Sequence, residues 1–387
     1  YDISLIATSA GTGNRKDVQV IGLNVLPDAD LSNQMRIGAG TVSTAGAQVL
    51  PSFWVCPNTP TTMWVAYLSA EDHNGSAARV YAARSTDGGV TWTKWQVDSG
   101  DGYHYYAPAI GGRADCSSVT VAWVRTTSTV SNVSYWLYAR TYSGGAWGAQ
   151  RTLDTLTSGS YYMADPAVIY DNNGDILATW FRSTGTGSTT GIYWSVSTNN
   201  GGSWSAAAGA VTGNTHRYPA LTLDTVNNHV WMAFSYLETT RDIYVKYWNG
   251  NTNAWNSTNT IVANTGDREN HPAIFYANGR LWVAWNRYTD YSNATPRLYY
   301  TYSTSTLPNI IWGTTYGPYG TRLAEHIPPS ITGDATYTYI AYLAYTDSFR
   351  GGNVYALRAP AAGGAPDMTY QLSATVDDPP LYARGNA

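Results

Sequence analysis

Histidines, arginines and tyrosines gather in this chain where a polar stretch enters an apolar strand or leaves the next one. Only 12% of the 387 residues are charged, so such gathering is informative. Of the six histidines, only His229 lies away from these strand ends. Arg125, Arg182 and Arg287 each stand two residues after the aromatic residue of a second strand. These residue types transfer protons and bind carboxylates, so they predict acid–base chemistry on an anionic ligand.

A sequence repeat positions these side chains. Glu269–Arg287 shows it most clearly, as a Pro-Ala-Ile start, a short strand, an Asn-Gly turn, and a second strand ending in Val-Ala-Trp. Alternating apolar residues around Asn-Gly predict a hairpin. An aromatic-rich third strand and a weaker fourth strand follow in each repeat. The repeat starts are Pro51, Pro108, Pro166, Pro219, Pro272 and Pro329.

Six such units with no helical pattern predict an all-β fold, a six-bladed β-propeller with four antiparallel strands per blade. Seven blades are the alternative, if the N-terminal residues and the C-terminus form a further blade. We expect the propeller to span residues 46–375. Residues 1–45 would supply N-terminal strands that close it, with 17–25 as the seam, and 376–387 would form a C-terminal tail.

Composition excludes several classes of protein. The net charge of −4 gives no reason to expect nucleic-acid binding, and no apolar stretch is long enough to cross a membrane. No signal peptide is visible, as expected of a mature or trimmed chain. The 32 Tyr and 16 Trp suit sugar binding, although β-sheets favour aromatic residues anyway. We expect a monomer without a cofactor or catalytic metal, and the Asp/Asn-rich turns leave structural calcium open.

The two cysteines, Cys56 and Cys116, follow the first strands of adjacent repeats. The two hairpin turns are therefore expected to be neighbours, and we predict a disulfide between them. A disulfide fits a secreted, extracellular protein. Two buried free thiols are the alternative.

Two turns after third strands share a further motif. Ser85–Trp92 reads S-x-D-x-G-x-T-W, and Ser197–Trp204 repeats it with Asn in place of Asp. The Asp or Asn is expected to cap the turn amides, with Gly at a positive φ and Trp between sheets. With this motif the chain resembles the sialidase-like, Asp-box (BNR) β-propeller superfamily. The resemblance implies a carbohydrate-active protein, because that superfamily contains sialidases, other exo-glycosidases, polysaccharide lyases and sugar-binding propellers.

The resemblance to sialidases themselves is partial. Glu269 precedes Arg287 as a glutamate precedes a carboxylate-binding arginine in sialidases, and Asp72 resembles their acid/base aspartate. Sialidases carry Arg-Ile-Pro at the first strand of blade one, whereas this chain has Val49-Leu50-Pro51 there and Arg217-Tyr218-Pro219 in blade four. A standard sialidase site is therefore not expected.

Three functions remain open, and we place cleavage of an acidic oligo- or polysaccharide first. A glycoside hydrolase needs two carboxyl groups. The candidates at the strand ends are Glu269, Glu325, Asp72 and Asp165. A polysaccharide lyase needs a His or Tyr acid–base pair and a cation that neutralises a uronate. A non-catalytic sugar-binding propeller is the third. The predicted catalytic residues are Glu269, His271, Asp72, Tyr218 and Glu325. The predicted substrate-binding residues are Arg217, Arg287, Arg125, Arg182, His216, His326 and Tyr106.

Overall fold

The computed structural model describes residues 2–4, 24–26, 48–69, 79–100, 104–127, 133–157, 162–184, 190–213, 215–237, 241–288, 296–305, 307–320, 323, 328–345 and 352–372. Within these ranges the regular elements are strands, and no helix is long and apolar enough to span a membrane. The strands form two compact units, which are described separately. The N-terminal unit contains β3–β15, and the C-terminal unit contains β1, β2 and β16–β28.

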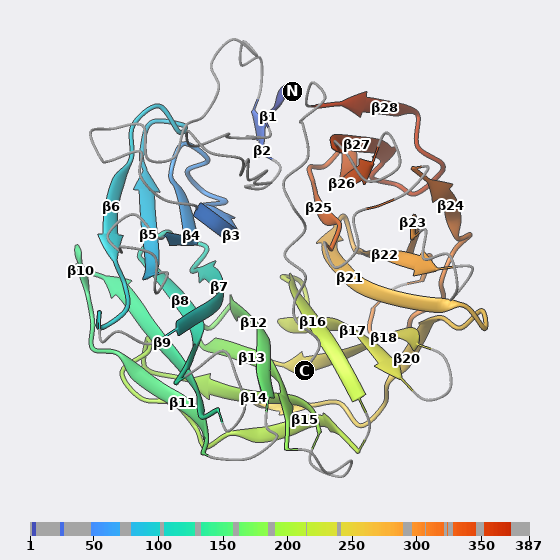
Figure 1. Ribbon diagram of the computed structural model, residues 1–387. Coiled ribbons are helices and arrows are strands. Elements are labelled where there is room, and N and C mark those ends of the chain that lie inside the picture. Colours follow the sequence, from blue (N-terminus) through green and yellow to red (C-terminus); the bar gives the residue numbers. More distant parts are fainter. Residues whose placement is uncertain are drawn as a thin grey trace. The chain divides into compact units, whose positions relative to one another are not determined.

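The N-terminal unit holds blades one to three (Figure 1). Blade one consists of β3 (Gln48–Val55), β4 (Met63–Ser69), β5 (Arg79–Ser85) and β6 (Thr93–Gln96). Blade two consists of β7 (His104–Gly112), β8 (Ser118–Thr126), β9 (Tyr135–Ser143) and, both paired with β9, β10 (Ala146–Trp147) and β11 (Arg151–Leu156). Blade three consists of β12 (Tyr162–Tyr170), β13 (Ile176–Ser183), β14 (Gly191–Ser197) and β15 (Ala208–Thr212).

The C-terminal unit holds blades four to six. Blade four consists of β16 (Thr215–Asp224), β17 (His229–Leu237), β18 (Arg241–Asn249) and, both paired with β18, β19 (Ala254–Trp255) and β20 (Thr260–Ala263). Blade five consists of β21 (Arg268–Ala277), β22 (Arg280–Tyr288), β23 (Arg297–Tyr302) and β24 (Tyr316–Tyr319). Blade six consists of β25 (Ser330–Gly333), β26 (Tyr337–Tyr345), β27 (Gly352–Pro360) and β28 (Met368–Gln371).

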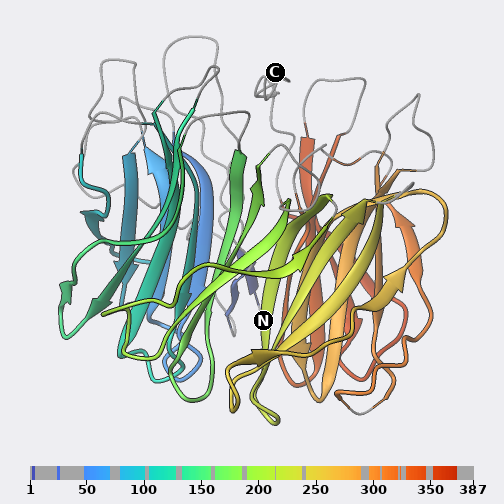
Figure 2. The ribbon, with the colours of Figure 1, turned by 90° about the horizontal axis from the view of Figure 1, so that it is seen from below.

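The predicted fold is confirmed: six antiparallel blades make a six-bladed β-propeller, and the seven-blade alternative is not needed. In blades two and four, two short strands pair with the third strand in place of a single fourth strand. β1 (Asp2–Ser4) and β2 (Asn24–Leu26) pair with each other. Most of the predicted seam, residues 17–25, lies outside the described residues, as do most of 1–45 and all of 376–387, so closure by the N-terminus stays a prediction. Within each unit the strands run between two loop edges (Figure 2).

Aromatic residues of the second strands form the cores between neighbouring sheets. Trp123, Trp180 and Trp285 are fully buried, and each is preceded by a small residue with no exposed surface. In the C-terminal unit, Trp285 packs with Trp231 and Ile274 between blades four and five. Truncating such a buried Trp to Ala typically costs about 3–5 kcal/mol, so these contacts hold neighbouring blades together.

A bulge interrupts the pairing of the first two strands just before the proline. In blades three, four and five the residue before proline has a left-handed backbone, with φ of 51° at Asp165, 57° at Tyr218 and 52° at His271. The strand register shifts at these points. A non-glycine residue in this conformation costs roughly 1–2 kcal/mol. Bulges re-aim side chains, and strain of this kind gathers at functional sites.

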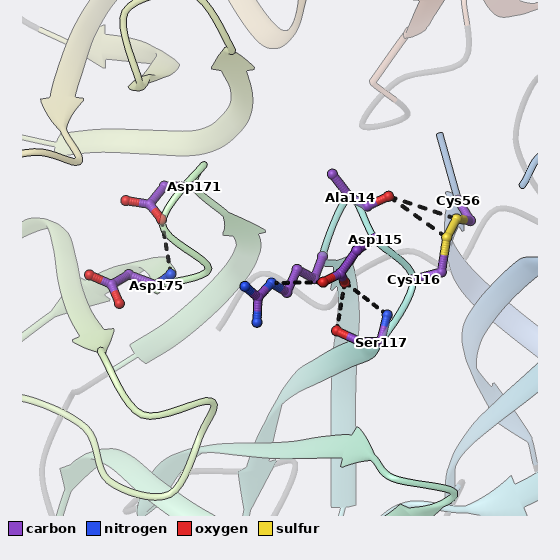
Figure 3. Close-up of polar contacts among 8 residues, drawn as sticks. Cys56, Ala114, Asp115, Cys116, Ser117, Asp171 and Asp175 are labelled. Atoms are coloured by element: carbon purple, nitrogen blue, oxygen red, sulfur yellow. Dashed lines mark hydrogen bonds and ion pairs between the residues drawn. A yellow bond between two sulfur atoms is a disulfide. The ribbon is translucent and has the colours of Figure 1, made fainter. Parts of the chain in front are cut away.

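The opposite loop edge of the N-terminal unit carries structural turns. Cys56 and Cys116 form the predicted disulfide, which joins the hairpin turns of blades one and two (Figure 3). Beside it, Asp115 accepts hydrogen bonds from the Ser117 amide and hydroxyl. The same edge carries the Asp-box turn, in which Asp87 accepts the Ser85 hydroxyl (2.7 Å) and the Thr91 amide (2.9 Å). The predicted capping of the turn amides is thereby confirmed.

Candidate functional site

Two rings meet where the first strands of blades four and five begin. Tyr218 and His271 occupy equivalent positions before their prolines, and their ring centroids lie 4.0 Å apart. β16 and β21 lie side by side within the C-terminal unit (Figure 1). His271 is buried and Tyr218 is partly exposed. The two left-handed bulges therefore bring together two side chains that can transfer protons.

Glu269 lies two residues before His271 and is fully buried. Its Oε1 accepts a hydrogen bond from the Thr265 hydroxyl, and its Oε2 has no hydrogen-bond partner among the described residues. Burial raises the pKa of Glu269 from 4.5 to about 7, against the hydrogen bond from Thr265 and the charge of Arg287. The negative charges of Asp242 and Asp267 raise it further. Near neutral pH this carboxyl can therefore give or take a proton.

Arg287 is held by acids of its own blade. Its Nε donates to Asp267 Oδ2 at 2.7 Å, and its Nη2 donates to the same oxygen. The Nε lies 3.8 Å from Glu269 Oε1, and the guanidinium lies over the Tyr299 ring at 5.0 Å. The predicted substrate-binding arginine thus already has carboxylate partners, and its contact with a ligand stays a prediction.

A second cationic group lies between blades four and five. Arg241 Nη1 donates to Asn270 Oδ1 at 3.1 Å. Burial, and then the charges of Arg268 and Arg217, lower the pKa of Arg241, while a hydrogen bond with Tyr218 opposes that shift. The guanidiniums of Arg268 and Arg217 therefore both act on Arg241, which also forms a hydrogen bond with Tyr218. Like charges held together favour an anion between them.

Two other predicted arginines are in the N-terminal unit. Arg125 Nη1 donates to the Tyr138 hydroxyl at 3.1 Å, and its guanidinium lies 4.6 Å from the Trp136 ring centroid. Arg182 Nη1 donates to both oxygens of Asp154 at 3.2 Å and lies over Tyr193 at 4.7 Å. Arg125 is anchored within blade two, whereas Arg182 of blade three pairs with Asp154 of blade two. No observation tests whether either arginine also binds a ligand.

The remaining predicted residues divide into two groups. His216 is buried and stacks on Tyr236, with centroids 4.4 Å apart and planes at 9°. Tyr106 is the exposed aromatic residue of β7. The others, Asp72, Glu325 and His326, lie outside the described residues.

Four residues of this site were given no role in the prediction from sequence. Arg268 and Asn270 flank Glu269 in the chain, and Arg241 and Thr265 belong to blade four and the loop after it. Alternation along β21 was the available signal, because it places Arg268 and Asn270 on one face and Glu269 on the other. No group of three or more metal-ligating side chains occurs in the described ranges.

Comparisons with known proteins agree with the fold. No family model matches the chain, and no curated protein matches it. Penicillium chrysogenum α-L-arabinanase, complexed with arabinobiose, aligns with a TM-score of 0.54 and 15% identity over 81% of this chain and 93% of that one. The GH93 α-L-arabinofuranosidase of Fusarium graminearum, with arabinobiose, aligns with a TM-score of 0.53 and 12% identity over 77% of this chain and 88% of that one.

A third similar structure is the leech intramolecular trans-sialidase, with a TM-score of 0.50 and 11% identity over 77% of this chain and 65% of that one. At such identities the similarity shows the fold alone. The chain shares the β-propeller fold of these enzymes, which is the fold that the sequence resemblance implied.

Proposed function

We propose that this protein is a carbohydrate-active enzyme that cleaves an acidic glycan, with its reacting groups at the ends of β16 and β21. The similar structures named above include glycoside hydrolases, which supports a carbohydrate substrate. The cationic group around Arg241 supports an acidic one. The residues at equivalent positions of neighbouring blades differ in type, as Tyr218 and His271 do. This difference favours one catalytic centre over a set of equivalent sugar-binding pockets.

Hydrolysis is the first reaction class, and Glu269 carries it. A glycosidase needs a carboxylic acid that is still protonated near neutral pH and can protonate the leaving oxygen. Glu269 has a pKa of about 7 and a free Oε2. Thr265 holds the other oxygen, so the carboxyl is fixed in orientation. Asp242, whose charge acts on Glu269, is the nearby candidate for the second carboxyl group.

Elimination is the second candidate, and the contact between Tyr218 and His271 favours it. A lyase removes the proton at C5 of a uronic acid after a cation has neutralised the carboxylate. Arg241, hydrogen-bonded with Tyr218, supplies such a cation, and the Tyr218 hydroxyl and the His271 imidazole supply an acid and a base. This arrangement needs no second carboxyl group.

One assay separates these reactions. The protein is incubated with acidic polysaccharides and sialosides, and new reducing ends are followed together with the ultraviolet absorbance of unsaturated uronates. Reducing ends alone mean hydrolysis, and both signals together mean elimination. Neither signal, with glycans still bound on an array, would refute the enzyme and leave a sugar-binding propeller. Loss of turnover in His271→Ala but not in Glu269→Gln would favour elimination.

Location and cofactor use belong to the same proposal. The Cys56–Cys116 disulfide supports a secreted protein. We propose that catalysis needs no cofactor, so that chelation leaves turnover unchanged, and that the enzyme acts as a monomer.

A further inference from the structure

Buried hydrogen-bond donors accumulate between β18 and β21. Asn270 has no exposed surface, and its Oδ1 is used by Arg241 Nη1 at 3.1 Å. The amide therefore turns its Nδ2 away from Arg241, and this nitrogen has no hydrogen-bond partner among the described residues. A buried donor without a partner costs about 1–3 kcal/mol, so a group that accepts this bond is expected.

Arg268 contributes a second unused donor. Its Nε is buried and also has no hydrogen-bond partner in the described part of the chain. Its guanidinium lies 5.1 Å from the centroid of the Tyr288 ring, which supports the charge without accepting a hydrogen bond in the plane of the group. The Nε–H of Arg268 thus has no acceptor among the described residues.

The nearby acids do not fill this role. Asp267 is bound to Arg287 through two hydrogen bonds, and Glu269 Oε1 is taken by Thr265. The strongest electrostatic neighbours of Arg241 are Arg268, Tyr218 and Arg217, two of which are cations. Around Arg241 the strongest charged neighbours are therefore cations, although Glu269 Oε2 is a further acceptor without a hydrogen-bond partner among the described residues.

We propose that Arg241, Arg268 and Asn270 bind an oxyanion of the substrate, a sugar carboxylate or a sugar sulfate. Both groups are acceptors only and carry the negative charge that three neighbouring guanidiniums favour. Asn270 acts as a specificity-determining residue, because its Nδ2 donates to an oxygen of the anion while the neighbouring guanidiniums favour a charged oxygen over a neutral hydroxyl. The inference rests on the proposed function for its substrate class, and it assigns the anion to these residues and not to Arg287.

Binding of small anions tests this site without turnover. Isothermal titration with glucuronate, galactose 6-sulfate and uncharged galactose is carried out on the wild type and on Asn270→Asp and Arg241→Met. Asn270→Asp keeps the shape and the contact with Arg241 but replaces the free donor by a negative oxygen. We expect affinity for one of the two anions to fall roughly tenfold to hundredfold in both variants. The preferred anion distinguishes a carboxylate from a sulfate.

Arg358→Met is the matched control, because Arg358 is paired with Asp367 and stacked on Tyr337 elsewhere in the same unit. It should leave anion affinity unchanged. Three outcomes would overturn the proposal. The wild type could bind neither anion, it could bind galactose as strongly as both anions, or Asn270→Asp could fold normally and keep its affinity for the anion. Anion binding without cleavage of any glycan would refute the proposed enzyme and leave this site standing.

Discussion

Arginines serve two purposes in this propeller, and blades two and three differ from the boundary of blades four and five in how they hold them. Arg182 has a carboxylate at 3.2 Å and a tyrosine ring beneath it, and Arg125 has a hydroxyl and a tryptophan ring. Arg241 instead has an amide oxygen and two further cations as neighbours. The first pair has carboxylate, hydroxyl and ring contacts inside the fold, whereas the second group places three positive charges around one amide oxygen.

The comparison shows that repetition in a propeller marks scaffold. Arg125, Arg182 and Arg287 occupy one sequence register and share one arrangement, each stacked on an aromatic residue of the third strand. Arg241 and Arg268 stand outside this register. Arg241 donates to Asn270, whose Nδ2 has no hydrogen-bond partner among the described residues, and Arg268 lies over the Tyr288 ring. The proposed site accordingly lies where the repeat is broken.

The largest effect is expected from Glu269→Gln. The substitution preserves shape but removes the acid, so kcat/KM on the glycan cleaved in the assay should fall roughly 10²- to 10⁴-fold. The folded state should survive, because a neutral amide suits this buried position. Steady-state kinetics of Glu269→Gln, with Asp367→Asn as the control variant, measure this effect. Activity within twofold of wild type would place the chemistry elsewhere.

The pH dependence of stability sharpens the comparison without a substrate. The folded state raises the pKa of Glu269 from 4.5 to about 7, so it binds this proton more tightly than the unfolded chain does. The resulting stability is complete below about pH 4.5 and is lost as pH rises through about 7, by at most about 3 kcal/mol. Urea unfolding at several pH values should show this loss in the wild type and not in Glu269→Gln. An equal change of unfolding free energy with pH in both proteins would contradict this expectation.

Arg182→Met tests the scaffold side of the comparison. Asp154 is largely buried, and losing its partner leaves a charge without compensation. Because Arg182 is partly exposed, we expect a loss of about 2 kcal/mol in the free energy of unfolding. The double variant Arg182→Met/Asp154→Asn should recover part of the lost unfolding free energy. A double-mutant cycle measures this recovery. Unchanged stability with weakened glycan binding would instead make Arg182 a ligand residue, as predicted from sequence.

Arg125→Met should have the smallest effect. Its partners Tyr138 and Trp136 are neutral, so the substitution strands no buried charge. A loss of about 0.5–1 kcal/mol is expected from the cation–π contact. Thermal unfolding of Arg125→Met and Arg182→Met under the same conditions shows which substitution costs more stability. A larger loss for Arg125 than for Arg182 would contradict the importance assigned to the acid partner.

The fold could be predicted from sequence because its signals are local. Asn278 and Gly279 have φ of 51° and 75°, as the Asn-Gly turn between β21 and β22 requires. Glu269 and His271 were found because they interrupt a repeated pattern. The pairing of Arg241 with Asn270 joins residues of different blades, 29 positions apart, and depends on how neighbouring sheets pack. No spacing along the chain encodes that contact, so the sequence did not predict it.

The left-handed residues before proline also limit how this protein can be altered. At positions 165, 218 and 271 the backbone demands a residue that tolerates positive φ, which Asn, Asp, His and Gly do and β-branched residues do not. Asp, Tyr and His already occupy these positions in successive blades. Saturation libraries at the three positions should therefore return folded variants for polar, unbranched residues and few for Val or Ile. New reactivities can be selected there while the sheets stay unchanged.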